Sequence, residues 1–207
     1  MVRIGETARR GVSVKPAVFI DRDGTINEQM GYVNHPSRFI LLPRVAEAIR
    51  LLNENGYLVF VVTNQSGVAR GYFPIELVYE IHRRMEDSLL QEGAKIDGIF
   101  FCPHYPSGVI NRYAITCKCR KPGTGLIEMA RNRFAIDITN SWVIGDTVSD
   151  IEMAKRAGIK SILVKTGYGL GEIEYVLPRK EITPDHIADG LFDAVCFILE
   201  NIVVQNR

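Results

Sequence analysis

The chain has 207 residues, of which 46% are hydrophobic and 24% are charged, and its formal net charge at pH 7 is +1. This composition is typical of a soluble globular protein, and the length suits one domain with a substantial core. A nearly neutral chain has no electrostatic basis for binding nucleic acid or an anionic membrane surface. The first 15 residues lack an apolar core of signal-peptide length. No apolar run approaches the roughly 20 residues of a membrane helix. We therefore expect a cytoplasmic protein with no nucleic-acid or membrane partner.

Apolar segments alternate with amphipathic segments from Ala17 onward. Short β-rich runs lie at 17–21, 57–63, 98–102, 141–145 and 160–164, and helical patterns lie at 43–55, 74–92, 124–134, 149–157 and 190–201. The strand segments are apolar on both faces, as in a parallel sheet that is covered by helices on each side. This alternation predicts a doubly wound, mainly parallel α/β fold. We expect residues 1–15 to form an N-terminal extension, residues 16–207 to form a single capless domain, and residues 166–185 to form a loop.

The first predicted strand runs into two carboxylates, in the segment Val18-Phe19-Ile20-Asp21-Arg22-Asp23-Gly24-Thr25. Alternate residues of a strand share a face, so Asp21 and Asp23 are expected to point together from its carboxyl end, where open α/β sheets bind ligands. Two like charges held so close are costly unless a cation lies between them. A hard divalent metal held by oxygens, Mg2+, meets that requirement. For such a pair taken alone, a turn that merely carries acidic residues is the alternative.

Polar residues also follow three later strands. The segment 63–66 (Thr63-Asn64-Gln65-Ser66) offers a hydroxyl and free backbone N–H groups that can hold phosphate oxygens. The pair Arg120-Lys121 places two cations beside a turn after the third strand. Asp146 and Asp150 follow the fourth strand and supply further carboxylates for a metal. Taken singly, Asp146 or Ser149 is also explained as the N-cap of the next helix, and Ser149 suits that role.

These four segments, in this order on successive strands, resemble the haloacid dehalogenase (HAD) superfamily of phosphohydrolases over about residues 17–165. The resemblance implies a phosphatase in which Asp21 is the nucleophile and forms an aspartyl-phosphate. Asp23 is the implied general acid, which protonates the leaving alcohol and then, as a base, activates water. Thr63 and Lys121 are the implied ligands of the transferring phosphoryl oxygens, where charge gathers in the transition state.

The same resemblance implies a catalytic Mg2+. Its ligands are Asp21, the backbone carbonyl of Asp23, and Asp146. Asp150 is implied to orient a metal-bound water or Lys121 from outside the coordination sphere. A dehalogenase does not need the same set of positive charges around its nucleophile, so a phosphatase is the preferred activity.

Three of the four cysteines lie close to a histidine, in Cys102-Pro103-His104 and Cys117-Lys118-Cys119. Three thiolates and one imidazole complete a tetrahedral zinc set with no position left for water, so we expect a structural Zn2+. Such an ion would order loop 102–119, which leads directly into Arg120. Reduced, unrelated thiols beside a surface histidine are the alternative. The remaining residues of these types are expected to be surface or structural: His35, His82, His186 and the buried Cys196.

A zinc loop inside a capless HAD domain narrows the resemblance to the family of D-glycero-D-manno-heptose 1,7-bisphosphate 7-phosphatases. The resemblance extends through Gly31-Tyr32-Val33, Thr63-Asn64-Gln65-Ser66-Gly67-Val68-Ala69-Arg70-Gly71 and Cys117-x-Cys119-Arg120-Lys121-Pro122. By the family's pattern, the substrate-binding residues are Gln29, Met30, Gly31 and Tyr32 in a flap, Asn64, Gln65 and Ser66 after the second strand, and Arg120. A guanidinium is well suited to the second phosphate of a bisphosphate.

One position departs from the family's pattern. Well-known members carry Lys followed by Leu-Glu-Asp after the fourth-strand aspartate, whereas this chain has Thr147-Val148-Ser149-Asp150. The lysine would help to hold the sugar phosphate, and Thr147 can donate a hydrogen bond but carries no charge. We expect Thr147 to contact the substrate more weakly, with the catalytic assignments unchanged.

The leading hypothesis is a Mg2+-dependent phosphomonoester hydrolase that acts in the cytoplasm on a small phosphorylated sugar. It removes the 7-phosphate of D-glycero-D-manno-heptose 1,7-bisphosphate, a step toward a lipopolysaccharide precursor. Histidinol-phosphate phosphatase, or a phosphatase of another small phosphomonoester, is the enzymatic alternative. A zinc-stabilised phosphosugar-binding or scaffold protein is the alternative from another class, and the intact Asp21 and Lys121 argue against it. The resemblance also implies a monomer.

Overall fold

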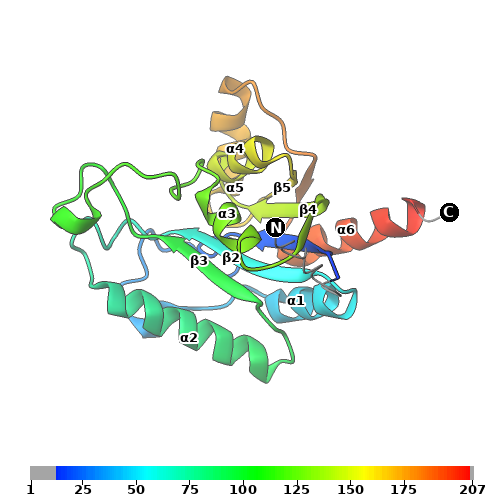
Figure 1. The fold of residues 1–207 in the computed structure, drawn as a ribbon, viewed down its shortest axis with the longest axis horizontal. Coiled ribbons are helices and arrows are strands. Elements are labelled where there is room, and N and C mark those ends of the chain that lie inside the picture. The colour runs from blue at the N-terminus through cyan, green and yellow to red at the C-terminus, as the bar shows by residue number, and fades with distance from the viewer. Residues whose placement is uncertain (1–12, 206–207) are drawn as a thin grey trace, which may run out of the picture.

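The computed structural model describes residues 13–205, with side chains described through Asn201, and is built around a six-stranded parallel sheet (Figure 1). The strands are β1 (Lys15–Ile20), β2 (Leu58–Asn64), β3 (Gly98–Cys102), β4 (Ile136–Gly145), β5 (Lys160–Val164) and β6 (His186–Ala188). They lie in the order β3-β2-β1-β4-β5-β6. The direction of winding reverses between β1 and β4, and open α/β sheets bind ligands at such a switch point.

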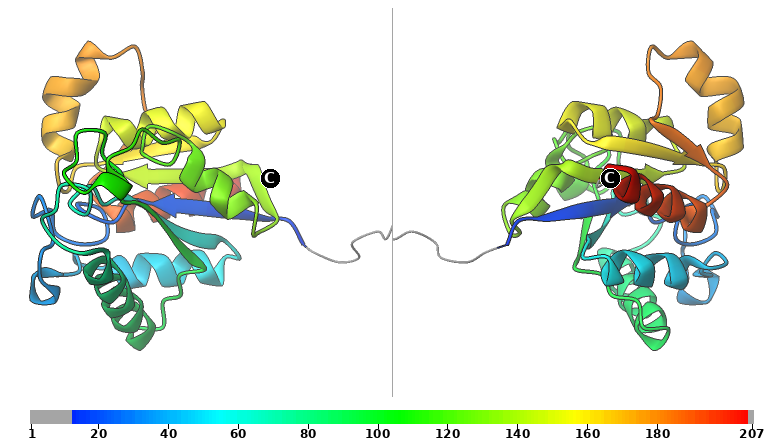
Figure 2. Two further views of the ribbon diagram at one scale, coloured as in Figure 1. Left: turned by 60° about the vertical axis from the view of Figure 1, so that its left-hand side comes forward. Right: turned by 90° about the vertical axis from the view of Figure 1, so that its right-hand side faces the viewer.

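Helices cover both faces of the sheet (Figures 1 and 2). Helices α1 (Val45–Glu54), α2 (Ile75–Gln91) and α6 (Leu191–Gln205) pack on one face, and α3 (Gly125–Arg131) and α4 (Val148–Ala157) pack on the other. The connections contain shorter helical turns: η1 (Pro36–Arg38), η2 (Asn111–Tyr113), α5 (Gly169–Gly171), η3 (Glu172–Val176) and η4 (Leu177–Arg179). The predicted doubly wound α/β fold is confirmed.

The two cores follow from the alternation of side chains along the strands. In β1, Val18 and Ile20 belong to the core beneath α1, α2 and α6, while Ala17 and Phe19 belong to the core beneath α3 and α4. In α2, Ile81, Met85 and Leu89 recur every four residues and are fully buried on the first of these cores. Burying each such side chain contributes about 1.5–3 kcal/mol.

The structure differs from the predicted elements mainly near the carboxyl end of the chain. The segment predicted as the loop 166–185 contains α5, η3 and η4, and β6 follows it. β6 has only three residues, too few for a readable alternation, and exists because His186 and its neighbours pair with β5. β1 begins at Lys15, inside the predicted extension, whose first 12 residues lie outside the described part. Among residues 13–205, none of the helices combines the length and apolar character that a membrane crossing requires.

Candidate active site

The carboxyl edge of the sheet surrounds a cavity of about 300 Å³, a volume suited to a small ligand. Its lining draws on all four predicted motifs and the predicted flap: Asp21, Asp23, Gln29, Gly31, Tyr32, Thr63, Asn64, Gln65, Ser66, Arg120, Lys121, Asp146 and Thr147, together with Ser149 and Tyr168. Met30 and Asp150 are not among the lining residues. Asp150 instead lies fully buried beside the cavity, where its carboxylate approaches Asp21 and Asp146.

The Lys121 ammonium is the centre of this site. Only 5% of Lys121 is exposed, and its Nζ lies 2.7 Å from Asp21 Oδ1, 2.7 Å from Asp150 Oδ1 and 3.0 Å from the carbonyl oxygen of Val62. The two carboxylate contacts are ion pairs, and the contact with Val62 is a hydrogen bond that the ammonium donates. Burial by itself lowers the pKa of Lys121, but the Asp150 and Asp21 carboxylates outweigh it and raise that pKa. Lys121 is therefore charged and fixed in place.

A cluster of buried carboxylates adjoins Lys121. Ligand oxygens of Asp21, Asp146 and Asp150 all lie within 4.8 Å of one another. Burial raises the pKa of Asp21 to about 6 although the Lys121 ammonium opposes it. Burial, and then repulsion by Asp21 and Asp150, raises the pKa of Asp146 to about 8. Asp146 Oδ2 accepts a hydrogen bond from the Tyr168 N–H at 2.9 Å, whereas its buried Oδ1 has no hydrogen-bond partner within residues 13–205. This set of hard oxygens fits a divalent cation such as Mg2+.

The backbone passes very close to these carboxylates at two glycines. Gly24 has a φ of +89°, and a Cβ built there would overlap the Asp146 carboxylate. A Cβ at Gly145 would overlap the Asp150 carboxylate in the same way. Glycine is needed at both positions because any larger residue would displace an acid of the cluster.

The position of Asp23 differs from the expectation from the sequence. We expected the Asp23 and Asp21 carboxylates to point together around a cation. The Asp23 side chain is absent from the acidic cluster and accepts hydrogen bonds from Arg22, Asn27 and Gln65 instead. Burial alone would raise the pKa of Asp23, but the Arg22 charge and these hydrogen bonds lower it. The alternation argument fails here because β1 ends at Ile20 and the chain turns before Asp23. The acids that accompany Asp21 follow β4 in the chain: Asp146 comes directly after the strand, and Asp150 lies in the first turn of α4.

The start of α4 engages two of the predicted residues. Thr147, rather than Ser149, is the N-cap of the helix, and its Oγ1 donates to Asp150 Oδ2 at 2.6 Å. The Thr147 N–H donates to the same oxygen at 3.2 Å, which completes a capping box. Asp150 thus caps α4 with one oxygen and contacts Lys121 with the other. The Thr147 hydroxyl also lies 2.8 Å from Ser149 Oγ, so the fold already uses its hydrogen-bonding capacity.

The end of β2 is tied to the turn that carries Lys121. Asn64 Oδ1 accepts from the Lys121 N–H at 3.0 Å, and Asn64 Nδ2 donates to the Lys121 carbonyl oxygen at 3.3 Å. Thr63 is almost completely buried, and its Oγ1 accepts from Gln65 Nε2 at 2.9 Å. Gln65 Nε2 also donates to Asp23 Oδ2 at 2.8 Å. Gln65 thus connects the predicted phosphate-binding hydroxyl of Thr63 with Asp23, and the neighbouring Asn64 holds the backbone of Lys121.

The predicted flap lies over one side of the cavity. Gln29 Nε2 lies 3.4 Å from the Asp23 carbonyl oxygen, and Gln29 Oε1 accepts from the Gly31 N–H at 2.9 Å. The Tyr32 ring meets the Tyr72 ring edge to face, with centroids 4.9 Å apart. The carbonyl of Met30 accepts the Tyr32 N–H at 2.8 Å, so Met30 shapes the turn from outside the cavity lining.

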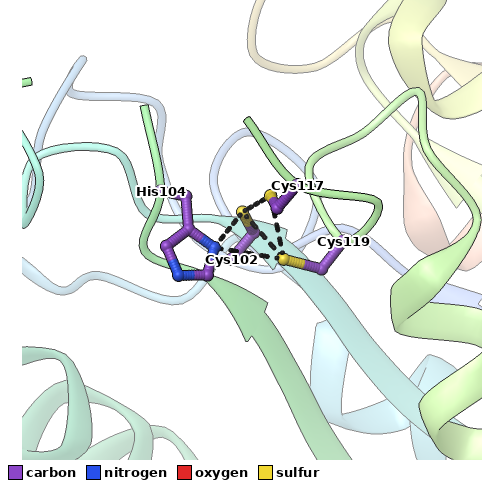
Figure 3. Close-up of side chains that lie close together, drawn as sticks. All are labelled: Cys102, His104, Cys117 and Cys119. Carbon is purple, nitrogen blue, oxygen red and sulfur yellow. Dashed lines mark hydrogen bonds between the residues drawn. The ribbon is translucent and has the colours of Figure 1, made fainter. Parts of the chain in front are cut away.

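The cysteines and histidine of loop 102–119 converge as the sequence predicts (Figure 3). Cys119 Sγ lies 3.1 Å from Cys117 Sγ, 3.3 Å from Cys102 Sγ and 3.3 Å from His104 Nδ1. A tetrahedral zinc with bonds of about 2.3 Å to sulfur separates its ligands by about 3.7 Å, so little movement is needed to bind it. The alternative of unrelated thiols is not supported, because these four atoms face one another.

Arg120 is anchored to this cysteine loop. Its Nη1 lies 3.4 Å from the His104 carbonyl oxygen, and its guanidinium carbon lies 5.3 Å from the centre of the Tyr105 ring. The same ring stacks on Arg70, whose guanidinium carbon is 3.6 Å from the ring centre. The cysteine loop therefore sets the position of the predicted substrate-binding arginine.

Comparison with known proteins assigns this site to a family. A family model described as HAD-hydrolase-like matches residues 118–194. The chain is 49% identical over 145 residues, 70% of this chain and 81% of the relative, to the D-glycero-beta-D-manno-heptose-1,7-bisphosphate 7-phosphatase of Rhodopseudomonas palustris. It is 42% identical to the enzyme of the same name from Yersinia pestis, over 86% of this chain and 92% of that relative. The chain belongs to this family of HAD-like hydrolases.

A solved structure agrees with this membership. The D,D-heptose 1,7-bisphosphate phosphatase of B. bronchiseptica, complexed with magnesium and phosphate, superposes with a TM-score of 0.79 at 31% identity. The match covers 90% of this chain and 99% of that one. The predictions of the HAD resemblance and of a phosphatase are thereby confirmed.

Three residues near the site of this HAD-like phosphatase were not anticipated. Tyr168 contacts Asp146 through its backbone N–H, a contact that any residue type could make and that no side-chain pattern reveals. Arg22 and His82 lie buried behind Asp23 and contact each other. Arg22 stands inside the Asp-Arg-Asp motif, so an arginine between two acids was the available signal. His82 lies on α2, and only the packing of that helix brings it to the site.

We predict that Mg2+ stabilises this HAD-like phosphatase more at pH 8 than at pH 5.5. Raised carboxyl pKa values contribute stability that is present at low pH and lost as the pH rises through about 6 for Asp21 and about 8 for Asp146. Protons compete with the cation at low pH, and the ionised cluster binds it at high pH. Thermal unfolding should show a Mg2+-induced rise of about 5 °C at pH 8, as expected for a ligand near 100 times its Kd.

At pH 5.5 the rise should be within about 1 °C of zero because Asp146 and most of Asp21 are protonated at that pH. The variant Asp146→Asn should lose most of the effect at pH 8, whereas the surface variant Asp189→Asn should retain it. Equal Mg2+ effects at both pH values would contradict the prediction.

Proposed function

We propose that this protein is a Mg2+-dependent phosphatase that removes the 7-phosphate of D-glycero-D-manno-heptose 1,7-bisphosphate. The observation that carries the proposal is the contact between Lys121 and Asp21 beside the acidic cluster. It supplies a buried nucleophile, a fixed cation for phosphoryl oxygens and hard ligands for a metal within one small cavity. The names of the two bacterial relatives support the heptose substrate and favour its β-anomer.

The first step forms an aspartyl-phosphate. The contacts that residues 13–205 make to the Asp21 carboxylate, from Lys121 Nζ and the Arg22 N–H, both engage Oδ1, so Oδ2 is the oxygen proposed to attack. The new Oδ2–P bond forms as the bond between phosphorus and the sugar oxygen breaks, and Asp23 gives its proton to that oxygen. Lys121 and the Thr63 hydroxyl hold the equatorial phosphoryl oxygens, whose charge they stabilise in place.

The second step releases inorganic phosphate. Water attacks the phosphorus, Asp23 accepts its proton, and the bond to Asp21 breaks, which restores the Asp21 carboxylate and the protonated form of Asp23. The lowered pKa of Asp23 keeps this carboxyl ionised in the free enzyme, and only an ionised carboxylate can accept a proton. The dianionic phosphate of the substrate raises the pKa of a neighbouring carboxyl by like-charge repulsion, and so favours the acid form in the first step.

Two metals are proposed, with different purposes. Asp21, Asp146 and the backbone carbonyl of Asp23 would hold Mg2+, which supplies charge stabilisation for the phosphoryl group. Asp150 orients Lys121 through their direct contact. The cysteine cluster of loop 102–119 would hold a structural Zn2+, because four protein ligands leave no open position. Reduced thiols suit a cytoplasmic setting, which we propose for this enzyme.

The second phosphate of the substrate is proposed to bind Arg120. The guanidinium lines the cavity together with Asn64 and Ser66. The side chains of these two residues offer further hydrogen-bond donors to the phosphate oxygens. The predicted contribution of Thr147 is small, since its hydroxyl already bonds Asp150. We propose that the protein acts as a monomer on this small phosphorylated sugar.

We predict that Asp21→Asn abolishes turnover, with phosphate release falling by a factor of about 10⁴ or more. An amide cannot act as the nucleophile, whereas the surface change Asp189→Asn should have no effect. The measurement is Mg2+-dependent phosphate release from both anomers of heptose 1,7-bisphosphate, from histidinol phosphate and from fructose 1,6-bisphosphate. The β-heptose bisphosphate should be the preferred substrate. Unchanged activity of Asp21→Asn would contradict the mechanism, and a preference for histidinol phosphate would contradict the substrate.

We predict that Arg120→Ala raises the KM for heptose 1,7-bisphosphate about 10- to 100-fold, as expected for losing hydrogen bonds worth about 1.5–3 kcal/mol to a charged group. The KM for heptose 7-phosphate, which lacks the second phosphate, should change much less. Arg112→Ala, an exposed change in the same loop, is the matched control. Equal effects on both substrates would mean that Arg120 does not recognise the second phosphate.

We predict that Cys117→Ser reduces bound zinc and lowers the Tm by about 5 °C or more, because a weakened cluster no longer orders its loop. Metal analysis of the purified protein and thermal unfolding are the measurements. Cys196→Ser, on α6 outside the cluster, should retain the zinc. A Cys117→Ser protein with full zinc content and an unchanged Tm would contradict the structural role.

A further inference from the structure

A fully buried arginine lies behind the proposed general acid. Arg22 is 0% exposed, and its Nη2 lies 2.8 Å from Asp23 Oδ1 and 2.7 Å from Oδ2. Its Nε lies 3.2 Å from the same Oδ1. This grip by a planar guanidinium fixes the orientation of the carboxylate as well as its charge.

Within residues 13–205, the other hydrogen bond of the guanidinium is with His82. Nη1 of Arg22 lies 3.2 Å from His82 Nε2, and only 5% of His82 is exposed. Arginine can only donate, so Nε2 must accept, and His82 is the neutral tautomer with its proton on Nδ1. Burial, and then the positive charge of Arg22, lowers the pKa of His82 to about 3, in agreement with that assignment.

His82 is itself held firmly. It lies on α2 between the core residues Ile81 and Met85, and its ring meets Phe101 of β3 edge to face, with centroids 5.3 Å apart. The position of His82 is thus set by the packing of α2 against the sheet rather than by the cavity. A buried guanidinium that lost this acceptor would leave a donor unsatisfied, and would be drawn away from its present position.

We propose that His82 is a positioning residue for catalysis, which holds Arg22 and through it the Asp23 carboxylate in the orientation needed for proton transfer. This inference rests on the acid and base roles that the proposed function gives to Asp23. It assigns a catalytic purpose to a histidine on a helix that contributes no residue to the cavity lining.

The two half-reactions allow a test that a general loss of structure would not mimic. Release of p-nitrophenolate from p-nitrophenyl phosphate needs no proton, whereas hydrolysis of the aspartyl-phosphate always needs Asp23 as base. A misplaced Asp23 therefore slows the second step alone with this substrate, and both steps with a sugar phosphate.

We expect His82→Leu to lower kcat for heptose 1,7-bisphosphate about ten-fold, part of the 10²–10⁴-fold that a general acid or base supplies. KM should change little. With p-nitrophenyl phosphate, rapid mixing should show a burst of about one equivalent of p-nitrophenolate per site, followed by a slow steady state. His82→Gln supplies a carbonyl acceptor and should restore kcat substantially. His186→Leu is the control variant and should behave like the unchanged protein. It removes a histidine that stacks on Phe197 at the opposite edge of the sheet.

Unchanged kinetics of His82→Leu would overturn the inference. The inference would also be overturned if His82→Leu reduced the burst amplitude, the burst rate and the steady-state rate by the same factor. A His82→Gln variant as impaired as His82→Leu would overturn it too. If His82→Leu does not fold, Arg22→Lys, which retains the charge but loses the planar grip, should show the same burst, and its absence would overturn the inference. Asp23→Asn separates the two levels: if that variant shows no burst, the proposed role of Asp23 is wrong, independently of His82.

Discussion

The contact of one buried ammonium with two buried carboxylates is the interaction on which the site depends. Lys121 lies between Asp21 and Asp150, and a lysine so deeply buried remains charged only because those acids surround it. The acids in turn tolerate their mutual repulsion because Lys121 offsets part of it, and a divalent cation would offset the rest. The parallel sheet makes this possible by bringing the carboxyl ends of β1 and β4 together at the point where the winding reverses.

Two structural features hold Lys121 in that position. Asp150 belongs to the first turn of α4, and its second oxygen completes the capping box with Thr147, so the start of the helix and Lys121 share one carboxylate. The second feature is the cysteine loop, which ends at Cys119 and passes directly to Arg120 and Lys121. A metal in that loop would therefore act on catalysis without touching the substrate, by limiting where these two cations can lie.

The two aspartates of the first motif have different surroundings, and this separation suits different chemical tasks. Asp21 lies among other acids, and burial raises its pKa to about 6. Asp23, two residues later, is held by Arg22, Asn27 and Gln65, and its pKa is lowered. In the proposed mechanism, Asp21 serves as metal ligand and nucleophile, and Asp23 exchanges protons. The difference arises because the strand ends at Ile20, so the two side chains do not share a face.

The sequence by itself determined the fold class, the four motifs and the cysteine cluster, because each depends on local spacing or on a rare combination of chemistry-bearing residues. Hydrophobic runs and strand-terminal acids were sufficient to place Asp21, Lys121 and Asp146 at one edge of a parallel sheet. Only the tertiary structure decided which acids adjoin Asp21, that Thr147 caps α4, that β6 exists, and that His82 reaches Arg22. These features depend on contacts between segments distant in the chain, and on turns whose geometry no periodic pattern describes.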